Sequence, residues 1–268
     1  MNLAICSLAS GSSGNCYVVR GGDTFVLVDA GISGKQIRER LSGIGLDPAQ
    51  LSAILLTHSH SDHVKGLAAL LKTTDACILT NRATAADACR DLPPSRIRFF
   101  ETGEGFALGD LQVCTFPVSH DTADPVGFTF RREDKQVSIV TDTGIVTAPV
   151  FDQICGADIL VLESNHDESI LRMGRYPWFL KQRILGEEGH LSNEAAAKAL
   201  AMALERELAE RSELRPRTVL LAHLSRENNF PEMALTTMNN ILEERGLLRS
   251  GLKIRVLPRT QQSPVYTV

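Results

Sequence analysis

The densest group of chemically active side chains is a His-x-His-x-Asp-His run that follows a short apolar segment at 52–56. On an extended chain, residues two apart face the same way, so His58 and His60 can bind one ion. Asp62 and His63 begin the next helix, from which they can turn towards a second ion. Imidazole and carboxylate ligands together suit zinc, manganese or iron. The run therefore predicts a metal site.

Four further segments place an acid or a histidine after apolar residues, and they occur in a fixed order along the chain. They are Val28-Asp29-Ala30-Gly31, Ser119-His120-Asp121, Val140-Thr141-Asp142-Thr143-Gly144 and Leu221-Ala222-His223-Leu224-Ser225. With the histidine run, this ordered set resembles the signature of the metallo-β-lactamase fold superfamily of binuclear metallohydrolases. The resemblance covers the whole chain.

The resemblance implies a role for each of these residues. The implied metal ligands are His58, His60, Asp62, His63, His120, Asp142 and His223. His58, His60 and His120 resemble the ligands of one ion, whereas Asp62, His63 and His223 resemble those of the other. Asp142 looks like the bridging carboxylate, and Asp29 is expected to orient the histidine loop. The expected cofactors are two divalent ions, zinc or manganese, with iron also compatible, holding a bridging hydroxide for hydrolysis.

Three features favour a phosphodiester among the substrates of such a centre. A Gly/Ser loop follows the first strand, and its Ser10, Gly11, Ser12, Ser13 and Asn15 can present N–H and hydroxyl groups to a phosphate, although a glycine-requiring hairpin explains the loop equally well. His190 and Glu163 resemble the pair that assists leaving-group departure in nuclease branches of the superfamily. We expect His190, Glu163 and Asp62 to be catalytic, whereas His166 stays open between a site role and a helix cap.

A third feature is the basic and aromatic segment 171–183. Arg172 and Arg175 can neutralise phosphates there, and an aromatic ring can stack on a base, although a solvated helix face with a buried Trp178 is an equal alternative. Ser225 and Asn228, with Arg226 and Asn229, follow the last histidine and are further candidates for holding phosphate. The sequences SLASGSSGN, ESNHD, LRMGRYPW, GHLSNE and AHLSRENN closely resemble the WalJ/YycJ-type branch, which implies 5′→3′ exonuclease activity on DNA.

Other functions remain open at this point. A tRNA-processing endoribonuclease is the main alternative, followed by a small-molecule lactonase or phosphodiesterase, and outside enzymology by a nucleic-acid-binding module with a structural metal. An exported β-lactamase is disfavoured because no signal peptide is evident. The net charge of −4 over 268 residues argues against coating nucleic acid by bulk charge, but not against a local basic surface.

Cysteine usage and hydropathy indicate the compartment. The six cysteines form no CxxC pair, so we expect reduced and mostly buried thiols. No stretch reaches the roughly 20 apolar residues of a membrane span. We therefore expect a cytoplasmic protein whose partner is nucleic acid, with DNA favoured, and no membrane. The sequence does not indicate an oligomeric state.

The elements that must position these residues alternate between strands and helices. Strands are expected at 3–8, 17–20, 25–28, 52–56, 77–79, 105–108, 111–116, 126–131, 136–140, 159–162, 218–221, 252–256 and 264–268. Helices are expected at 33–42, 64–71, 177–185, 193–210 and 233–244, and another is expected to begin at an Asn81 cap and to end before Leu92. This pattern predicts an α/β fold in one domain, 1–268. We expect a four-layer αββα sandwich of two mixed sheets with helices on the outer faces.

Overall fold

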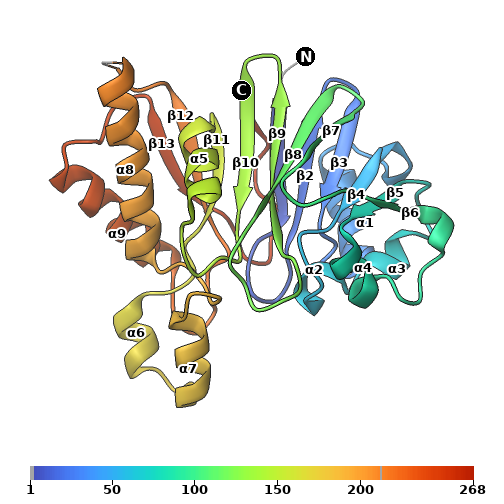
Figure 1. Ribbon diagram of the computed structural model, residues 1–268, viewed down its shortest axis with the longest axis horizontal. Coiled ribbons are helices and arrows are strands. Elements are labelled where there is room, and N and C mark those ends of the chain that lie inside the picture. Colours follow the sequence, from blue (N-terminus) through green and yellow to red (C-terminus); the bar gives the residue numbers. More distant parts are fainter. Residues whose placement is uncertain (1–2, 212) are drawn as a thin grey trace. The chain divides into compact units, whose positions relative to one another are not determined.

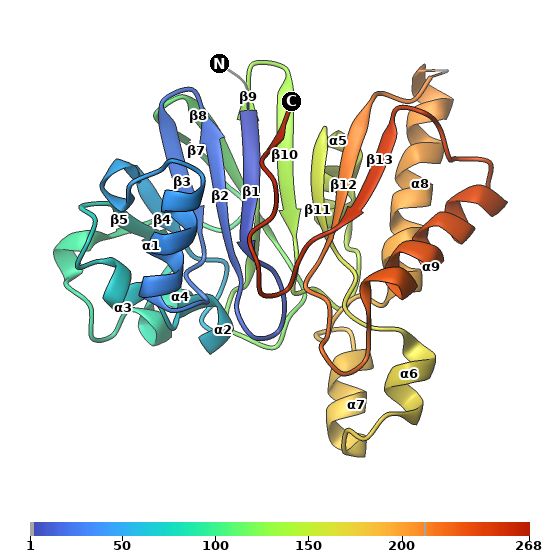
Figure 2. The same cartoon turned by 180° about the vertical axis from the view of Figure 1, so that it is seen from behind.

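A computed structural model describes residues 3–211 and 213–268 (Figures 1 and 2). The chain forms two compact units. Unit 1 comprises Met1–Pro117, Thr122–Lys135 and Pro258–Val268, whereas unit 2 comprises Val118–Asp121 and Gln136–Leu257. The strands group into two seven-stranded sheets, and helices accompany both. The predicted α/β chain with two mixed sheets is confirmed, whereas its description as one domain stays a prediction.

Unit 1 contains a complete mixed sheet in the order β14-β1-β2-β3-β4-β5-β6. Its strands are β1 (Leu3–Ala9), β2 (Cys16–Gly21), β3 (Thr24–Val28), β4 (Ala53–Leu55), β5 (Cys77–Thr80), β6 (Ile97–Phe99) and β14 (Tyr266–Thr267). β14, β1, β2 and β3 pair antiparallel, whereas β3 to β6 pair parallel. Val28 is in register with Leu55, so the chain leaves β3 and β4 at the same edge.

Four short helices accompany this sheet in unit 1: α1 (Gly34–Gly43), α2 (Ser61–Val64), α3 (Leu67–Leu70) and α4 (Arg82–Ala88). Ser33 caps α1 and Asn81 caps α4, as their side-chain oxygens accept backbone N–H groups. The single helix expected at 64–71 is wrong, because α2 and α3 are separate helices on either side of Gly66. The backbone of Ile32 passes so close to Gly66 that a Cβ there would lie 2.0 Å from its carbonyl oxygen.

Three strands of the second sheet also belong to unit 1: β7 (Gly105–Leu108), β8 (Leu111–Pro117) and β9 (Val126–Arg132). They form an antiparallel meander. Along the first five residues of β8, buried and more exposed residues alternate in the period of two that an antiparallel sheet with one covered face requires.

Unit 2 contains the parallel part of the second sheet. Its strands are β10 (Lys135–Val140, apart from its first residue), β11 (Ile159–Glu163), β12 (Arg217–Ala222) and β13 (Leu252–Val256). All five residues of β11 are buried, which is typical of a parallel strand covered on both faces. The ends of β10, β11 and β12 are level, since Leu162 pairs with both Val140 and Leu221.

The helices of unit 2 are α5 (Ala148–Gly156), α6 (Glu168–Met173), α7 (Trp178–Leu185), α8 (Asn193–Arg211) and α9 (Pro231–Glu244). α8 packs against α5 and α9. Its small alanine side chains allow these neighbouring helices to approach it closely. The Ser192 hydroxyl accepts the N–H of Ala195 and so caps α8 as expected. Among the described residues, no helix combines the length and apolarity needed to cross a membrane.

The six cysteines are unpaired, and half of them are less buried than expected. Cys6, Cys16 and Cys89 are buried, whereas Cys77, Cys114 and Cys155 are only partly covered. The expectation that most would be buried holds for three of the six.

A buried ion-pair network joins α8 to β12. Glu207 contacts Arg217 at 2.6 Å and Arg215 at 2.7 Å, and both Glu207 and Arg217 are buried. Burial raises the pKa of Glu207, but the hydrogen bonds from Arg215 and the charge of Arg217 outweigh it and hold the pKa below the ordinary 4.5. The pair therefore stabilises the fold above that pH, and its contribution falls as acid protonates Glu207.

Replacing Glu207 tests this network. Glu207→Gln leaves the Arg217 charge buried without its partner, and we expect a loss of about 3 kcal/mol in the free energy of unfolding at pH 7. The loss is expected to shrink below pH 4.5, and urea unfolding across pH measures it. Glu205→Gln on the same helix removes an exposed pair with Arg245 and is expected to cost less than about 0.5 kcal/mol. Equal losses in the two variants would contradict the account.

Candidate active site

In unit 1, the segment 57–63, called the histidine loop, is held in place by Asp29, the residue that follows β3. The buried Asp29 carboxylate accepts the backbone N–H and the hydroxyl of Thr57, each at 2.9 Å, and lies 2.7 Å from Nδ1 of His63. Burial raises the pKa of Asp29, while His63 and the Thr57 hydrogen bonds oppose the shift. Three donors converge on this side chain, which is the arrangement that an ionised carboxylate requires.

This contact pattern selects one tautomer for His58 and for His63. His63 donates its Nδ1–H to Asp29, so its Nε2 carries the lone pair. The Thr57 hydroxyl gives its proton to Asp29 and therefore accepts from Nδ1 of His58, at 2.9 Å. The lone pair of His58 is then also on Nε2. The ring centroids of these two histidines are 4.0 Å apart, and that of His60 lies 4.8 Å from His58.

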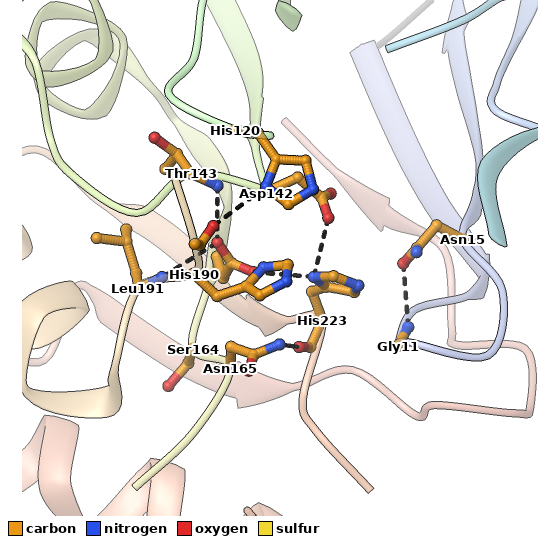
Figure 3. A network of polar contacts seen from close by, with 12 residues as sticks. Gly11, Asn15, His120, Asp142, Thr143, Ser164, Asn165, His190, Leu191 and His223 are labelled. Carbon is orange, nitrogen blue, oxygen red and sulfur yellow. Dashed lines mark hydrogen bonds and ion pairs between the residues drawn. The ribbon is translucent and has the colours of Figure 1, made fainter. Parts of the chain in front are cut away.

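Asn15 and Gly31 determine where the loop runs. The Asn15 side-chain amide donates to Asp62 at 3.3 Å and contacts Nε2 of His63 at 3.0 Å, and its oxygen accepts the Gly11 N–H (Figure 3). A Cβ on Gly31 would lie 1.7 Å from the carbonyl oxygen of Asp62, so no larger residue fits there. Gly31, two residues after Asp29, therefore permits the close approach of the loop.

In unit 2, Glu163 at the end of β11 is the centre of a second polar cluster. Its Oε1 accepts from Nδ1 of His190 at 2.7 Å and from Nδ1 of His223 at 2.8 Å. Its Oε2 accepts the backbone N–H groups of Thr143 and Leu191. Figure 3 shows Thr143, His190, Leu191 and His223 converging from separate segments of unit 2. Because β10, β11 and β12 end level, the sheet itself brings the residues that follow these strands together.

The charge state of Glu163 follows from its partners. Burial would raise the pKa of Glu163, but the charges and hydrogen bonds of His190 and His223 lower it to about 2. The carboxylate is therefore ionised at neutral pH. It fixes Nδ1–H on both histidines and leaves the lone pair of each neutral ring on Nε2.

Asp142 and His120 complete the unit 2 cluster. Asp142, Glu163, His190 and His223 each place a potential ligand atom within 4.8 Å of the others. His120 donates its Nδ1–H to the Gly189 carbonyl at 3.1 Å, and its ring centroid lies 4.9 Å from that of His190. Within each unit, the structure thus brings together the predicted metal-site residues that this unit contains.

Three of the site residues adopt a left-handed backbone that is rare outside glycine. Asp29, Asp142 and His223 have φ of 60°, 57° and 55°. Each lies shortly after the end of a strand, where the chain turns sharply. This conformation costs about 1–2 kcal/mol per residue and is concentrated at functional sites.

The structure corrects several of the predicted phosphate-binding side chains. Ser10 and Asn15 are fully buried, and their side chains bond to Tyr17 and to the histidine loop, so neither is placed to contact substrate directly. Ser225 and Asn228 are also buried and bond to each other within their own turn. These side chains shape loops instead.

Other predicted substrate contacts lie at the surface. Ser12 and Ser13 are exposed, whereas Gly11 is buried in the same loop. Arg172 and Arg175 are exposed on and after α6, and Arg172 pairs with Glu168 at 3.2 Å. The alternative of a buried Trp178 is wrong, because this side chain is 69% exposed.

Some functional contacts were missed by sequence reasoning. Thr57 was not singled out, although a threonine directly before the first histidine is well placed to bond to the carboxylate after the neighbouring strand. The contact of Glu163 with His223 was also missed, because 60 residues separate them and only the parallel register of β11 and β12 brings them together.

The structure decides one of the two alternatives for His166. Asp167, not His166, caps α6 by accepting the N–H of Ile170, so the helix-cap alternative is wrong. The His166 ring is buried, and within the described residues neither nitrogen has a hydrogen-bond partner. Burial lowers the pKa of His166 to about 4, so the ring is neutral near pH 7.

Comparison with known proteins places this geometry in a family. The model of the β-lactamase superfamily domain matches residues 24–210. Exodeoxyribonuclease YycJ from Bacillus anthracis is 39% identical over 249 residues, covering 92% of this chain and 91% of that protein. Exodeoxyribonuclease WalJ from Streptococcus pneumoniae serotype 2 (strain D39) is 40% identical over 245 residues, covering 90% of this chain and 88% of the relative.

The solved structures agree on the fold. The metallo-β-lactamase fold protein YhfI from Bacillus subtilis has a TM-score of 0.68 at 16% identity, covering 99% of this chain and all of its own. This likeness confirms the fold class predicted from the sequence. The chain belongs to the β-lactamase superfamily and, within it, to the branch that contains YycJ and WalJ.

Proposed function

We propose that the protein is a metal-dependent nuclease that degrades DNA from the 5′ end towards the 3′ end. The observation that carries this proposal is the His190–Glu163 pair, which lies beside Asp142 and His223 in unit 2. A histidine held by a buried carboxylate suits a reaction whose leaving oxygen needs a proton. The names of the relatives YycJ and WalJ support an exodeoxyribonuclease.

The ligand set expected from the sequence fits divalent metal ions. His58, His60 and His120 would hold one ion, whereas Asp62, His63 and His223 would hold the other, with Asp142 between them. The donor chemistry supports this assignment, because Nδ1 of His58, His63, His120 and His223 is engaged and the lone pair lies on Nε2. When bound, zinc or manganese, or else iron, supplies an activated water and neutralises charge on the phosphate.

His190 is proposed to donate a proton to the departing 3′ oxygen. Its Nδ1–H is held by Glu163, and its side chain is about one-fifth exposed, so Nε2 is the atom available to the substrate. Glu163 also stabilises the protonated ring by its charge. Asp62 is a proposed ligand and catalytic residue whose side chain is partly exposed and oriented by Asn15.

Of the predicted substrate contacts, those with exposed side chains are proposed to bind the phosphates. Ser12 and Ser13 can donate hydroxyl groups to a phosphate, and Arg172 and Arg175 can neutralise one. DNA as partner, a cytoplasmic location and a single functional domain belong to the same proposal.

A substrate and metal matrix tests the proposed reaction. Purified protein with manganese, zinc or magnesium is incubated with end-labelled duplex DNA, single-stranded DNA and pre-tRNA. We expect nucleotides to be released from the 5′ end of DNA, and Asp142→Ala to reduce the rate by at least about a hundredfold. Turnover of a lactone or thioester without any phosphodiester cleavage would contradict the proposal. Wild-type binding without cleavage, retained in Asp142→Ala, would indicate a binding module.

The role of His190 has its own test. His190→Ala is expected to slow DNA cleavage by about 10²–10⁴-fold, because the leaving oxygen loses its proton donor. A p-nitrophenyl ester of thymidine 5′-phosphate has a leaving group that needs no proton, so its cleavage is expected to fall by less than about tenfold. Exposed Glu187→Ala in the same loop is the control. Equal losses on both substrates would show that His190 does not act as the acid.

The role of Asp29 is tested by metal affinity. Asp29→Asn removes the charged acceptor of the His63 proton, and we expect manganese affinity to fall by about 10–100-fold. Exposed Asp87→Asn on α4 is the matched control and is expected to bind as the wild type does. Calorimetric titration of the metal-free proteins measures both. Unchanged affinity in a folded Asp29→Asn protein would contradict the positioning role.

A further inference from the structure

α6 and α7 form a helical arm, residues 168–185, that stands away from α8 and α9 in both views of unit 2 (Figures 1 and 2). The two helices contact each other. α7 has no buried residue, and in α6 only Leu171 is buried. The arm therefore contributes little to the core of its unit and presents most of its side chains to solvent.

The arm exposes two neighbouring aromatic rings at the start of α7. Trp178 is 69% exposed and Phe179 is 74% exposed. Two large apolar side chains exposed in succession indicate an interaction site, because leaving them in water forgoes the gain from burial. Two consecutive rings on one helical turn also offer π faces to a partner.

The charges of the arm identify the kind of partner. It carries four cationic side chains, Arg172, Arg175, Lys181 and Arg183, against one acid, Glu168, although the whole chain has a net charge of −4. Arg172 pairs with Glu168, and Arg183 with Asp121, through partly exposed groups that solvent screens. Cations interleaved with exposed rings match a polyanion with flat bases.

The arm is attached to the same loops that carry the candidate site. The His190 N–H bonds to the Ile184 carbonyl at 3.0 Å, so the end of α7 holds the loop of the proposed acid. At the other end, the Asp167 N–H bonds to the Asn228 carbonyl at 3.0 Å, in the turn that follows His223. A strand held by the arm is thus close to His190 within unit 2.

We propose that the arm is a stacking platform for unpaired DNA bases, with Trp178 and Phe179 against the bases and Arg175 and its neighbours against the phosphates. This inference rests on the proposed nuclease function and specifies its substrate as a single strand or a single-stranded end. Bases inside a duplex hide their faces, so a duplex interior cannot use these rings. A protein partner would not need the excess of cations.

The single tryptophan of the chain gives a direct readout. An oligothymidylate of about 12 nucleotides with cleavage-resistant phosphorothioate linkages is titrated into the metal-loaded protein. Trp178 fluorescence is expected to be quenched at saturation, while a blunt duplex of the same length quenches it much less. Anisotropy of a labelled strand reports binding independently. A strand that binds by anisotropy without quenching Trp178 would overturn the stacking platform.

Substitutions separate stacking from apolar contact. The Trp178→Leu/Phe179→Leu double variant keeps apolar side chains but removes both rings, and single-strand affinity is expected to fall at least about tenfold. Trp178→Phe keeps a ring and is expected to retain most of the affinity. Met173→Ala removes an exposed apolar side chain without a ring and is expected to bind as the wild type does. Unchanged affinity in the double variant, or an equal loss in Met173→Ala, would overturn the proposal.

Cleavage assays distinguish a failure of the arm proposal from a failure of the nuclease proposal. If the double variant digests single-stranded DNA as fast as the wild type, the arm has no substrate role and the nuclease proposal stands. If the wild type cleaves no nucleic acid and binds none, both proposals fail. The expected result is slower cleavage of single-stranded ends by the double variant, with cleavage of the p-nitrophenyl ester unchanged.

Discussion

Two buried carboxylates determine how the histidines of this protein can be used. Asp29 at the end of β3 and Glu163 at the end of β11 each accept Nδ1–H of a histidine, and Asp29 also fixes His58 through Thr57. A histidine in water exchanges tautomers and rotates freely. Here the contacts assign the proton to Nδ1, so the lone pair of each neutral ring lies on Nε2, the atom that the proposed metal binding and proton transfer would use.

The parallel strands make this arrangement possible. β3 and β4 end level in unit 1, as do β10, β11 and β12 in unit 2, so within each unit residues distant in sequence meet at the ends of its parallel strands. The left-handed backbones of Asp29 in unit 1 and of Asp142 and His223 in unit 2 turn the chain shortly after these strand ends. The strain of these turns is offset by the buried strands before them, which contain the apolar core of each unit.

Much of the fold followed from local patterns, because strands and capped helices leave periodic and compositional signals. α5 and α6 gave weaker signals and were missed, since each is short and lies between stronger apolar segments. The ordered ligand motifs were recognisable because metal ligands need particular side chains at particular strand ends. The contact of Glu163 with His223 was not, because it depends on strand register. Ser10 and Asn15 were predicted to contact substrate because their side chains are polar. Both are buried and form hydrogen bonds inside the protein, and burial cannot be read from these residues in the sequence.

The central claim is that histidines oriented by buried carboxylates hold two metal ions that enable DNA cleavage. The most direct measurement is a manganese titration of the metal-free protein, with bound ions counted by calorimetry and 5′ nucleotide release followed on the same samples. We predict two ions bound per chain and cleavage that develops as the sites fill. Full cleavage by protein that binds no ion, or two bound ions without phosphodiester cleavage, would contradict it.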